Sequence, residues 1–464
     1  IRQLAASGIN LVFPEVIYNG YSAYKSKFLI QQDNWNGTDI LSVIIDECHK
    51  NRIEVHPWVR VFKAGYKDDK GGILSIHNDW VAKDFYGGSL FADGSYWLCP
   101  SNIESRKLLI NAYSELVRKY DIDGIHLDYI RYADQIVADT CYDDRCIDLF
   151  KNQTGMDPRK IEPYTPQVID WHMWREEQIN SFVSQCSSKL KSLDPKLIIS
   201  AAVVSPYTKA RTAYFQNWVN WCENGWVDFV VPMEYTGDER SFIRRMSKNL
   251  SDAPLNVFTV SGIGAHVLKN DQIIRQIGIS EFLSADGFSV FSASYLGSDT
   301  LAWLEKTNIR RNISLPYRNS SLLSKILLRS IMKRLIPPID PIDLISASID
   351  ASHVNKMLRY AEREKIKQSY IKPSPPPIFI PDVIQPIPSI AANKLIESPN
   401  IDAMEDACWH NVTPKYIELS NFGFPILNKT DFRVGFDDKN IYFYIVAYEK
   451  DMSLIKANIH KRDD

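Results

Sequence analysis

The sequence predicts an α/β protein built on a (β/α)8 TIM barrel that lacks its first strand, followed by an incomplete C-terminal β-sandwich-like segment. The chain has 464 residues, 45% of them hydrophobic and 24% charged, which is enough for a large core and more than one domain. Short apolar segments alternate with amphipathic stretches, as in parallel βα units. A proline-rich stretch then separates this part from a region with β-hairpin character.

Seven apolar segments have the length of barrel strands, whereas a closed TIM barrel has eight. The chain opens on a short helical pattern that ends at Gly8, so we expect the missing strand to be the first one. Helical patterns lie between the strand segments, for example at 103–120, where Leu109, Ala112 and Leu116 recur on one face. The predicted strands are Ile9–Ile17, Ile53–Val61, Ile122–Arg131, Leu197–Ser205, Val227–Tyr235, Leu255–Gly262 and Asp286–Ala293.

The chain is predicted to contain four successive parts, of which the barrel covers residues 1–313. Residues 314–370 carry two helical patterns and are predicted to form a helical extension. Residues 371–389 are rich in proline and are predicted to be a stiff linker. Residues 390–464 are predicted to begin a β domain, because two strand patterns flank a polar turn there, at 431–436 and 441–446.

Composition and motif content exclude several classes of site. A formal net charge of -2 gives no field that would attract nucleic acid, and no apolar run is long enough to span a membrane. The 7 cysteines and 9 histidines show no zinc-ligand spacing, and nucleotide-binding motifs are absent, so no metal and no cofactor is expected. Cys141 and Cys146 are close enough in sequence for either a local disulfide or two free thiols.

The predicted strand at 122–131 is apolar but ends in polar side chains. Because side chains alternate across a strand, His126 and Asp128 share one face, and the opposite face must pack against helices. Asp128 should therefore point into the mouth of the barrel, the carboxyl end of the strands, where TIM barrels carry their chemistry. Arg131 follows and is expected to keep Asp128 ionised. Asp123, at the start of the strand, is interpreted as a structural cap.

The run Asp-Gly-Ile-His-Leu-Asp-Tyr-Ile at 123–130 resembles the fourth-strand motif of the family 18 chitinases, but Ile130 stands where they carry their catalytic Glu. Together with the segments 97–102, 174–177 and 231–236, the run resembles the glycosyl hydrolase-like 10 barrels more closely. The resemblance covers the chain to about residue 311. It implies a TIM barrel that acts on glycans, in some members on the glycan strands of the bacterial cell wall, and that is usually exported.

Glycoside hydrolysis generally needs two carboxyl groups that flank the scissile bond. Asp128 is predicted to be one of them, in the role of nucleophile or base. Glu177 is a candidate for the other, because it follows Trp174 at the expected start of a helix, where the family motif tends to carry an acidic residue. Glu15 is a second candidate, near the end of its own strand. Glu234 is discounted, because the resemblance places its neighbours inward and strand parity turns it away.

Sugar contacts are expected from aromatic and polar side chains at the mouth. His56 and Trp58 share one face of a strand, and the Trp58 ring could stack on a sugar face, with core packing as the alternative. The other candidate substrate-binding residues are His126, Arg131, Tyr132 and Tyr235.

The sequence thus predicts a glycoside hydrolase with a two-carboxylate mechanism, acting on a polysaccharide or a peptidoglycan glycan strand. The alternative is a barrel that binds glycan without cleaving it, as the apolar side chain of Ile130 suggests. The segment 401–409 resembles the opening of family 9 carbohydrate-binding modules, which implies a sugar-binding role for the C-terminal β segment. The resemblance to the glycosyl hydrolase-like 10 barrels also implies a secreted, periplasmic or cell-surface protein, with a signal peptide outside this sequence.

Overall fold

The computed structural model describes residues 1–134, 139–162, 165–254, 257–307, 315 and 317, and the strands of the C-terminal part. The chain divides into two compact units, residues 1–160 with 172–377 and residues 161–171 with 378–464. The expected helices between 320 and 367 and the proline-rich linker at 371–389 lie outside the described residues.

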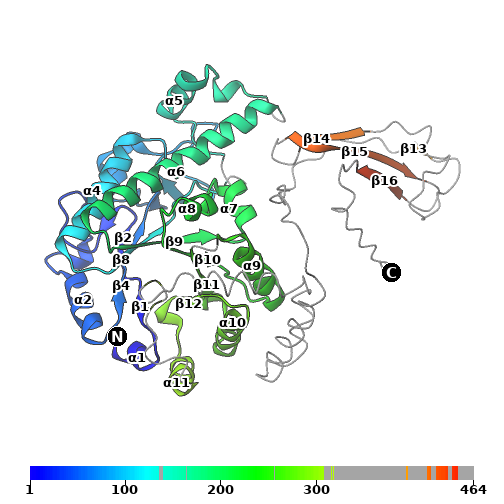
Figure 1. Ribbon diagram of the computed structural model, residues 1–464. Helices are drawn as coiled ribbons and strands as arrows, with labels where there is room; N and C mark the ends of the chain where they lie inside the picture. Colours follow the sequence, from blue (N-terminus) through cyan, green and yellow to red (C-terminus); the bar gives the residue numbers. More distant parts are fainter. Residues whose placement is uncertain are drawn as a thin grey trace. The chain divides into compact units, whose positions relative to one another are not determined.

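The first unit is a TIM-barrel-like α/β fold in which each parallel strand pairs with the next one along the chain (Figure 1). All seven predicted strands are confirmed, and the sheet order is β12-β11-β10-β9-β8-β5-β2-β3. The strands are β1 (Leu11–Val12) with β2 (Glu15–Tyr18), β4 (Glu54–Val55) with β5 (Trp58–Arg60), β8 (Gly124–Asp128), β9 (Ile198–Val204), β10 (Phe229–Met233), β11 (Phe258–Gly264) and β12 (Gly287–Phe291). Three short antiparallel strands extend the loops at the mouth, β3 (Tyr21–Ser22), β6 (Lys63–Tyr66) and β7 (Ser95–Trp97).

Proline divides the first two barrel strands into halves, although the sequence predicts each as one segment. Pro14 separates β1 from β2, and Pro57 separates β4 from β5. A proline has no N–H to donate to the ladder, but its carbonyl still accepts. The Trp58 N–H donates to the Pro14 carbonyl at 2.7 Å, and the His126 N–H donates to the Pro57 carbonyl at 3.0 Å. The sheet therefore continues across both interruptions.

Helices follow the strands and surround the barrel (Figure 1). The predicted helix at 103–120 is confirmed as α4, whose cap Asn102 accepts hydrogen bonds from the backbone of Glu104 and Ser105. The helices are α1 (Arg2–Ala6), α2 (Ile40–Lys50), α3 (Gly72–Ile76), α4 (Ile103–Lys119), α5 (Asp144–Thr154), α6 (Pro166–Leu193), α7 (Tyr207–Tyr214), α8 (Trp218–Glu223), α9 (Glu239–Asp252), α10 (Asn270–Phe282) and α11 (Ser298–Thr307).

Apolar and aromatic side chains fill the floor of the barrel, the end opposite the mouth. Phe229 is a buried member of a cluster formed mainly by the strands, and Tyr317 packs against this cluster from a distant part of the chain. The Tyr317 ring stacks on Phe229 with ring centres 5.4 Å apart, and its hydroxyl donates to Glu54 at 3.2 Å. The barrel core thus includes a residue beyond the end of its last helix.

Close packing explains why glycine occupies position 124, within the Asp-Gly run of the sequence motif. A Cβ atom there would lie 2.5 Å from the Ile198 carbonyl and 2.7 Å from the His56 ring. We expect Gly124→Ala to lower the free energy of unfolding by about 1–3 kcal/mol, because the strand and the ring must separate. Urea denaturation measures the change. Gly278→Ala is the control, since nothing lies within 4 Å of its added Cβ inside α10, and it should be neutral or slightly stabilising.

The second unit contains a four-stranded sheet at 393–447. Its strands are β13 (Asn393–Lys394), β14 (Lys415–Leu419), β15 (Pro425–Phe436) and β16 (Ile441–Ala447). The predicted hairpin is confirmed, because β15 and β16 pair antiparallel from Phe436 opposite Ile441 onward. In the described part of the chain, no helix combines the length and the apolar character that crossing a membrane requires.

Candidate active site

Asp128 ends β8 at the mouth of the barrel, as strand parity predicts. The side chain is 7% exposed, and its Oδ1 accepts a hydrogen bond from the Tyr129 backbone N–H at 2.6 Å. This contact depends on the left-handed backbone of Tyr129, with φ of 53°, which is uncommon for a residue other than glycine. Burial raises the pKa of the Asp128 carboxyl, and Arg131, the Tyr129 N–H and Arg60 lower it less. The expected action of Arg131 is present, but burial outweighs it.

A second carboxyl group lies close by on the same side of the barrel. Arg60 lies opposite Asp128 in the β5–β8 register, and its Nε donates to Glu15 Oε1 at 2.6 Å. Burial raises the pKa of Glu15, Arg60 lowers it, and the charge of Asp128 raises it. Glu15 lies on β2, Arg60 on β5 and Asp128 on β8, so the two carboxyl groups flank Arg60 and their titrations are coupled.

Three cationic side chains surround the ring of Tyr129, the residue next to Asp128. The charged centres lie 4.8 Å from the ring centre for Arg131, 5.1 Å for Lys63 and 5.3 Å for Arg60. Burial lowers the pKa of the Lys63 ammonium group, and both guanidinium groups lower it further. The mouth thus combines two carboxyl groups with an aromatic ring and several positive charges.

Aromatic side chains form another part of the mouth. Tyr235 stacks on Phe291 with ring centres 5.8 Å apart, and Trp58 meets Phe291 edge-on at 5.7 Å. His266 contacts Tyr235, Phe291 and Tyr295. Phe291 and Tyr295 are 37% and 53% exposed, so their rings can reach a ligand. The charge of Asp128 acts on the Tyr235 phenol, so the aromatic group and the carboxyl pair belong to one site.

Three of the expected sugar-binding residues lie deeper than predicted. His126 does share the inward face with Asp128, but its ring packs on Phe13 at 4.1 Å and its Nδ1 bonds with the Ser200 hydroxyl at 2.8 Å. His56 is fully buried near the floor, beside Phe229. Tyr132 is 1% exposed, and its hydroxyl lies 3.6 Å from the Cys141 sulfur. Parity fixes the face of a strand residue, but it does not fix its depth in the barrel.

The other candidate for the partner carboxylate, Glu177, lies away from Asp128. The expected helix start near Trp174 is wrong, because α6 begins at Pro166 and Glu177 is in its middle. Glu177 is exposed and accepts a hydrogen bond from Asn180 at 3.5 Å. It is not among the described groups that act on Asp128. Its neighbour Glu176 bonds with Arg211 at 2.8 Å.

Glu234 faces away from the mouth, as parity predicts. It is fully buried between β10 and α9, and Ser205 donates to its Oε2 at 2.8 Å. Asn249 of α9 donates to its other oxygen. Burial raises the pKa of Glu234 to about 7.

Comparison with known proteins identifies the family. The family model described as glycosyl hydrolase-like 10 matches residues 1–270, more than half of the chain. The chain belongs to the glycosyl hydrolase-like 10 family.

Curated relatives of this glycosyl hydrolase-like 10 chain have similar names at low identity. It is 24% identical to glycosyl hydrolase YngK of Bacillus subtilis over 224 residues, 43% of this chain and 39% of that one. It is 23% identical to glycosyl hydrolase DigH of Escherichia coli K12 over 279 residues, 53% of this chain and 58% of that one. The chain therefore spans less than two thirds of the length of either relative.

A solved structure supports the same fold. The glycoside hydrolase domain of PgaB from Bordetella bronchiseptica matches with a TM-score of 0.51 at 11% identity, over 67% of this chain and 92% of that one. At this identity the likeness concerns the fold alone.

Sequence reasoning did not select several side chains of the site in this family member. Arg60 has the parity of Trp58 and could have been found from it, since both lie on β5. Lys63 lies just beyond β5, on β6. His266, Phe291 and Tyr295 come from the ends of later strands or the loops after them, where no motif distinguishes them from core residues.

Proposed function

We propose that this protein is a glycoside hydrolase in which Asp128 and Glu15 are the two carboxyl groups of the reaction. The observation that carries the proposal is their placement at the mouth, on strands separated only by β5, where each is coupled to Arg60. Acid–base or nucleophilic cleavage of a glycosidic bond needs such a pair. The exposed aromatic rings beside them suit the stacking of sugar faces.

The environments of the two carboxyl groups suggest different roles. Asp128 is almost fully desolvated, which favours its protonated form and the role of proton donor to the leaving oxygen. Burial raises the pKa of Glu15 as well, but Glu15 is more exposed than Asp128 and its direct ion pair with Arg60 opposes the rise, which favours giving Glu15 the role of base or nucleophile. This assignment reverses the role that the sequence predicts for Asp128, because burial outweighs the effect of Arg131.

For the substrate we propose a polysaccharide or a cell-wall glycan strand, reached by an exported protein. Relatives named glycosyl hydrolases support a glycan substrate, and a 23% identical relative over 262 residues is named an S-layer-related protein, from Niallia circulans. We also propose sugar binding for the C-terminal sheet, from its sequence likeness to family 9 modules.

Substitution of the two candidate partners tests the choice between them. We expect Glu15→Gln to lower the release of reducing ends from the best substrate by about 10²-fold or more, because the general base or nucleophile is lost. Glu177→Gln should retain most of the activity. The assay compares peptidoglycan glycan strands with plant and host polysaccharides, and circular dichroism verifies folding. Loss of activity only in the Glu177 variant would reject Glu15.

The same panel tests the non-catalytic alternative. A wild-type chain that binds a glycan in a pull-down but releases no reducing ends from any member would be a glycan-binding barrel. The proposed hydrolase instead requires both binding and release.

A further inference from the structure

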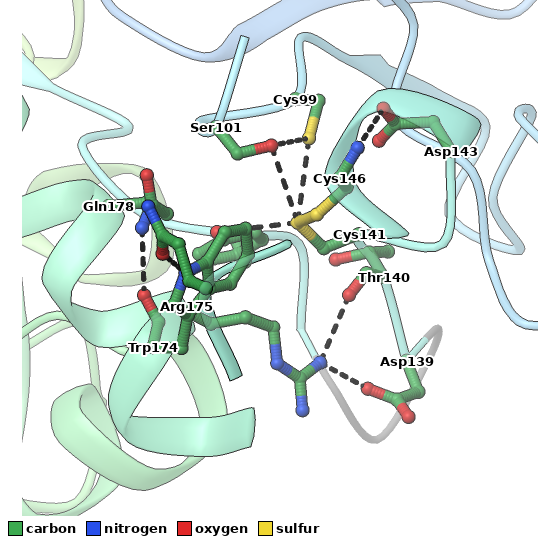
Figure 2. Close-up of a disulfide and its surroundings, with 12 residues drawn as sticks. Cys99, Ser101, Asp139, Thr140, Cys141, Asp143, Cys146, Trp174, Arg175 and Gln178 are labelled. Carbon is green, nitrogen blue, oxygen red and sulfur yellow. Dashed lines mark hydrogen bonds and ion pairs between the residues drawn. A yellow bond between two sulfur atoms is a disulfide. The ribbon is translucent and has the colours of Figure 1, made fainter. Parts of the chain in front are cut away.

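Four buried side chains that could hold a metal ion meet near Tyr132, in the loop region after β8. In the described part of the chain, the group is Cys99, Cys141, Asp143 and Cys146, whose ligand atoms all lie within 4.8 Å of one another. Cys99 follows β7, and the others lie on the loop before α5 and on its first turn. Figure 2 shows the Cys99 thiol directed at the disulfide that joins Cys141 and Cys146.

The disulfide alone does not explain this arrangement. It settles the choice left open by the sequence between a bond and two free thiols, yet a third sulfur, Cys99 Sγ, lies 3.5 Å from Cys141 Sγ. Asp143 caps α5 through Oδ1, which accepts from the Cys146 N–H at 3.2 Å. Its Oδ2 is buried, and the Cys99 thiol lies against this carboxylate as a weak donor. A thiol compensates a buried carboxylate only weakly, and a cation bound among the sulfurs would compensate it better.

Zinc fits the residue types and the spacing. With Zn–S near 2.3 Å and Zn–O near 2.1 Å, ligand atoms on a tetrahedral zinc lie about 3.5–3.8 Å apart. The Cys99–Cys141 sulfur separation is already close to that value. We propose that the reduced chain binds a zinc ion through these four side chains, Cys99, Cys141, Cys146 and Asp143. Zinc and the disulfide are alternatives, because both use the sulfurs of Cys141 and Cys146.

The surroundings of the four side chains are suited to thiolates. The Ser101 hydroxyl lies 3.0 Å from Cys99 Sγ and 3.8 Å from Cys141 Sγ, and the Tyr132 hydroxyl lies 3.6 Å from Cys141 Sγ. Hydroxyl groups at such distances can donate to metal-bound sulfur. Three thiolates and one carboxylate carry four negative charges, of which zinc offsets two. Two buried guanidinium groups, those of Arg106 and Arg175, act on the Tyr132 phenol together with Cys99 and Asp143, so positive charge lies near the four side chains, although Arg175 is also paired with Asp139.

Zinc content of the full chain tests the proposal. Protein purified without oxygen, in a phosphine reductant with one equivalent of ZnCl₂, is desalted and measured by mass spectrometry of the metal. We expect about one zinc per wild-type chain and at least a tenfold lower content in Cys99→Ala. Asp143→Asn keeps the cap acceptor of α5 but should bind zinc more weakly. Cys48→Ala, at a buried free cysteine on α2, should match the wild type.

Two further measurements identify the site. Co²⁺ in place of zinc should give the visible and near-ultraviolet bands of a tetrahedral thiolate site in the wild type and not in Cys99→Ala. Oxidation to the Cys141–Cys146 disulfide before metal addition should abolish zinc binding. Cys99→Ala retains that disulfide, so its folding can be verified by its oxidised thermal transition. Equal zinc content in the wild type and Cys99→Ala, or in the reduced and oxidised chains, would overturn the proposal.

Discussion

Asp128→Asn should lower kcat/KM for glycan cleavage by about 10²- to 10⁴-fold, the contribution typical of a positioned general acid. The amide keeps the acceptor for the Tyr129 N–H and the volume of the side chain, so the mouth should keep its shape. What the variant loses is the acidic proton that a general acid donates to the leaving oxygen. Reducing-end release under subsaturating substrate measures the change.

The matched control lies on the same segment. Asp123 precedes β8, where it accepts hydrogen bonds from the Val55 N–H and from His49, each at 2.8 Å. Asp123→Asn should alter stability and leave kcat/KM within a few fold of the wild type, because this carboxyl is at the floor end of the strand. An Asp128→Asn protein with full activity would remove the central assignment. The wild-type activity should also extend to higher pH than an exposed Asp would allow, since burial raises the pKa of the proton donor.

Glu234→Gln should raise the free energy of unfolding at pH 8 by about 3 kcal/mol relative to its effect at pH 5. The pKa of Glu234 is raised from 4.5 to about 7 in the folded protein. For an acid with a raised pKa, the folded state binds the proton more tightly than the unfolded state. Its contribution to stability is therefore lost as pH rises from about 4.5 to about 7. Glutamine stays neutral and can still bond with Asn249 and Ser205.

Urea denaturation of the wild type and the variant at both pH values measures this difference. Taking the difference between proteins at each pH cancels the other titrating groups, such as His126, whose pKa burial lowers to about 3. Glu104→Gln, at an exposed ion pair with Lys107, is the control and should show little pH dependence. An equal effect of Glu234→Gln at pH 5 and pH 8 would contradict the buried, protonatable carboxyl.

The barrel could be predicted from the sequence because its strands are nearly continuous apolar runs between clear helical patterns. Strand parity also placed Asp128 and His126 inward and Glu234 outward, since the side-chain period of two depends on the backbone alone. The start of α6 was missed although Thr165 followed by Pro166 is a usual helix start, because the prediction relied on the acidic residues after Trp174. The breaks at Pro14 and Pro57 were missed because each proline lies inside an apolar run that has the length of one strand.

Strand position predicted some side chains of the candidate site, but not how deep they lie or which partners they contact. Asp128, Trp58, Arg131 and Tyr235 could be selected from their positions near strand ends. The depth of each side chain and its contact partners could not be predicted, because they depend on strands that meet only in the folded barrel. Arg60 bonds with Glu15 across 45 residues of sequence and acts on Asp128 from the neighbouring strand, and Cys99 meets Cys141 across 42. No spacing rule for short motifs detects such pairs.

The floor of the barrel can be completed only after residues late in the chain have been synthesised. The Ser7 hydroxyl donates to the Leu301 carbonyl at 3.1 Å, which joins the first helix to α11, and Tyr317 covers His56 and Phe229 from beyond that helix. A ribosome releases the early strands long before either partner exists. Part of the apolar surface of those strands therefore stays exposed until residue 317 has left the ribosome. During this stage chaperones can bind the nascent chain.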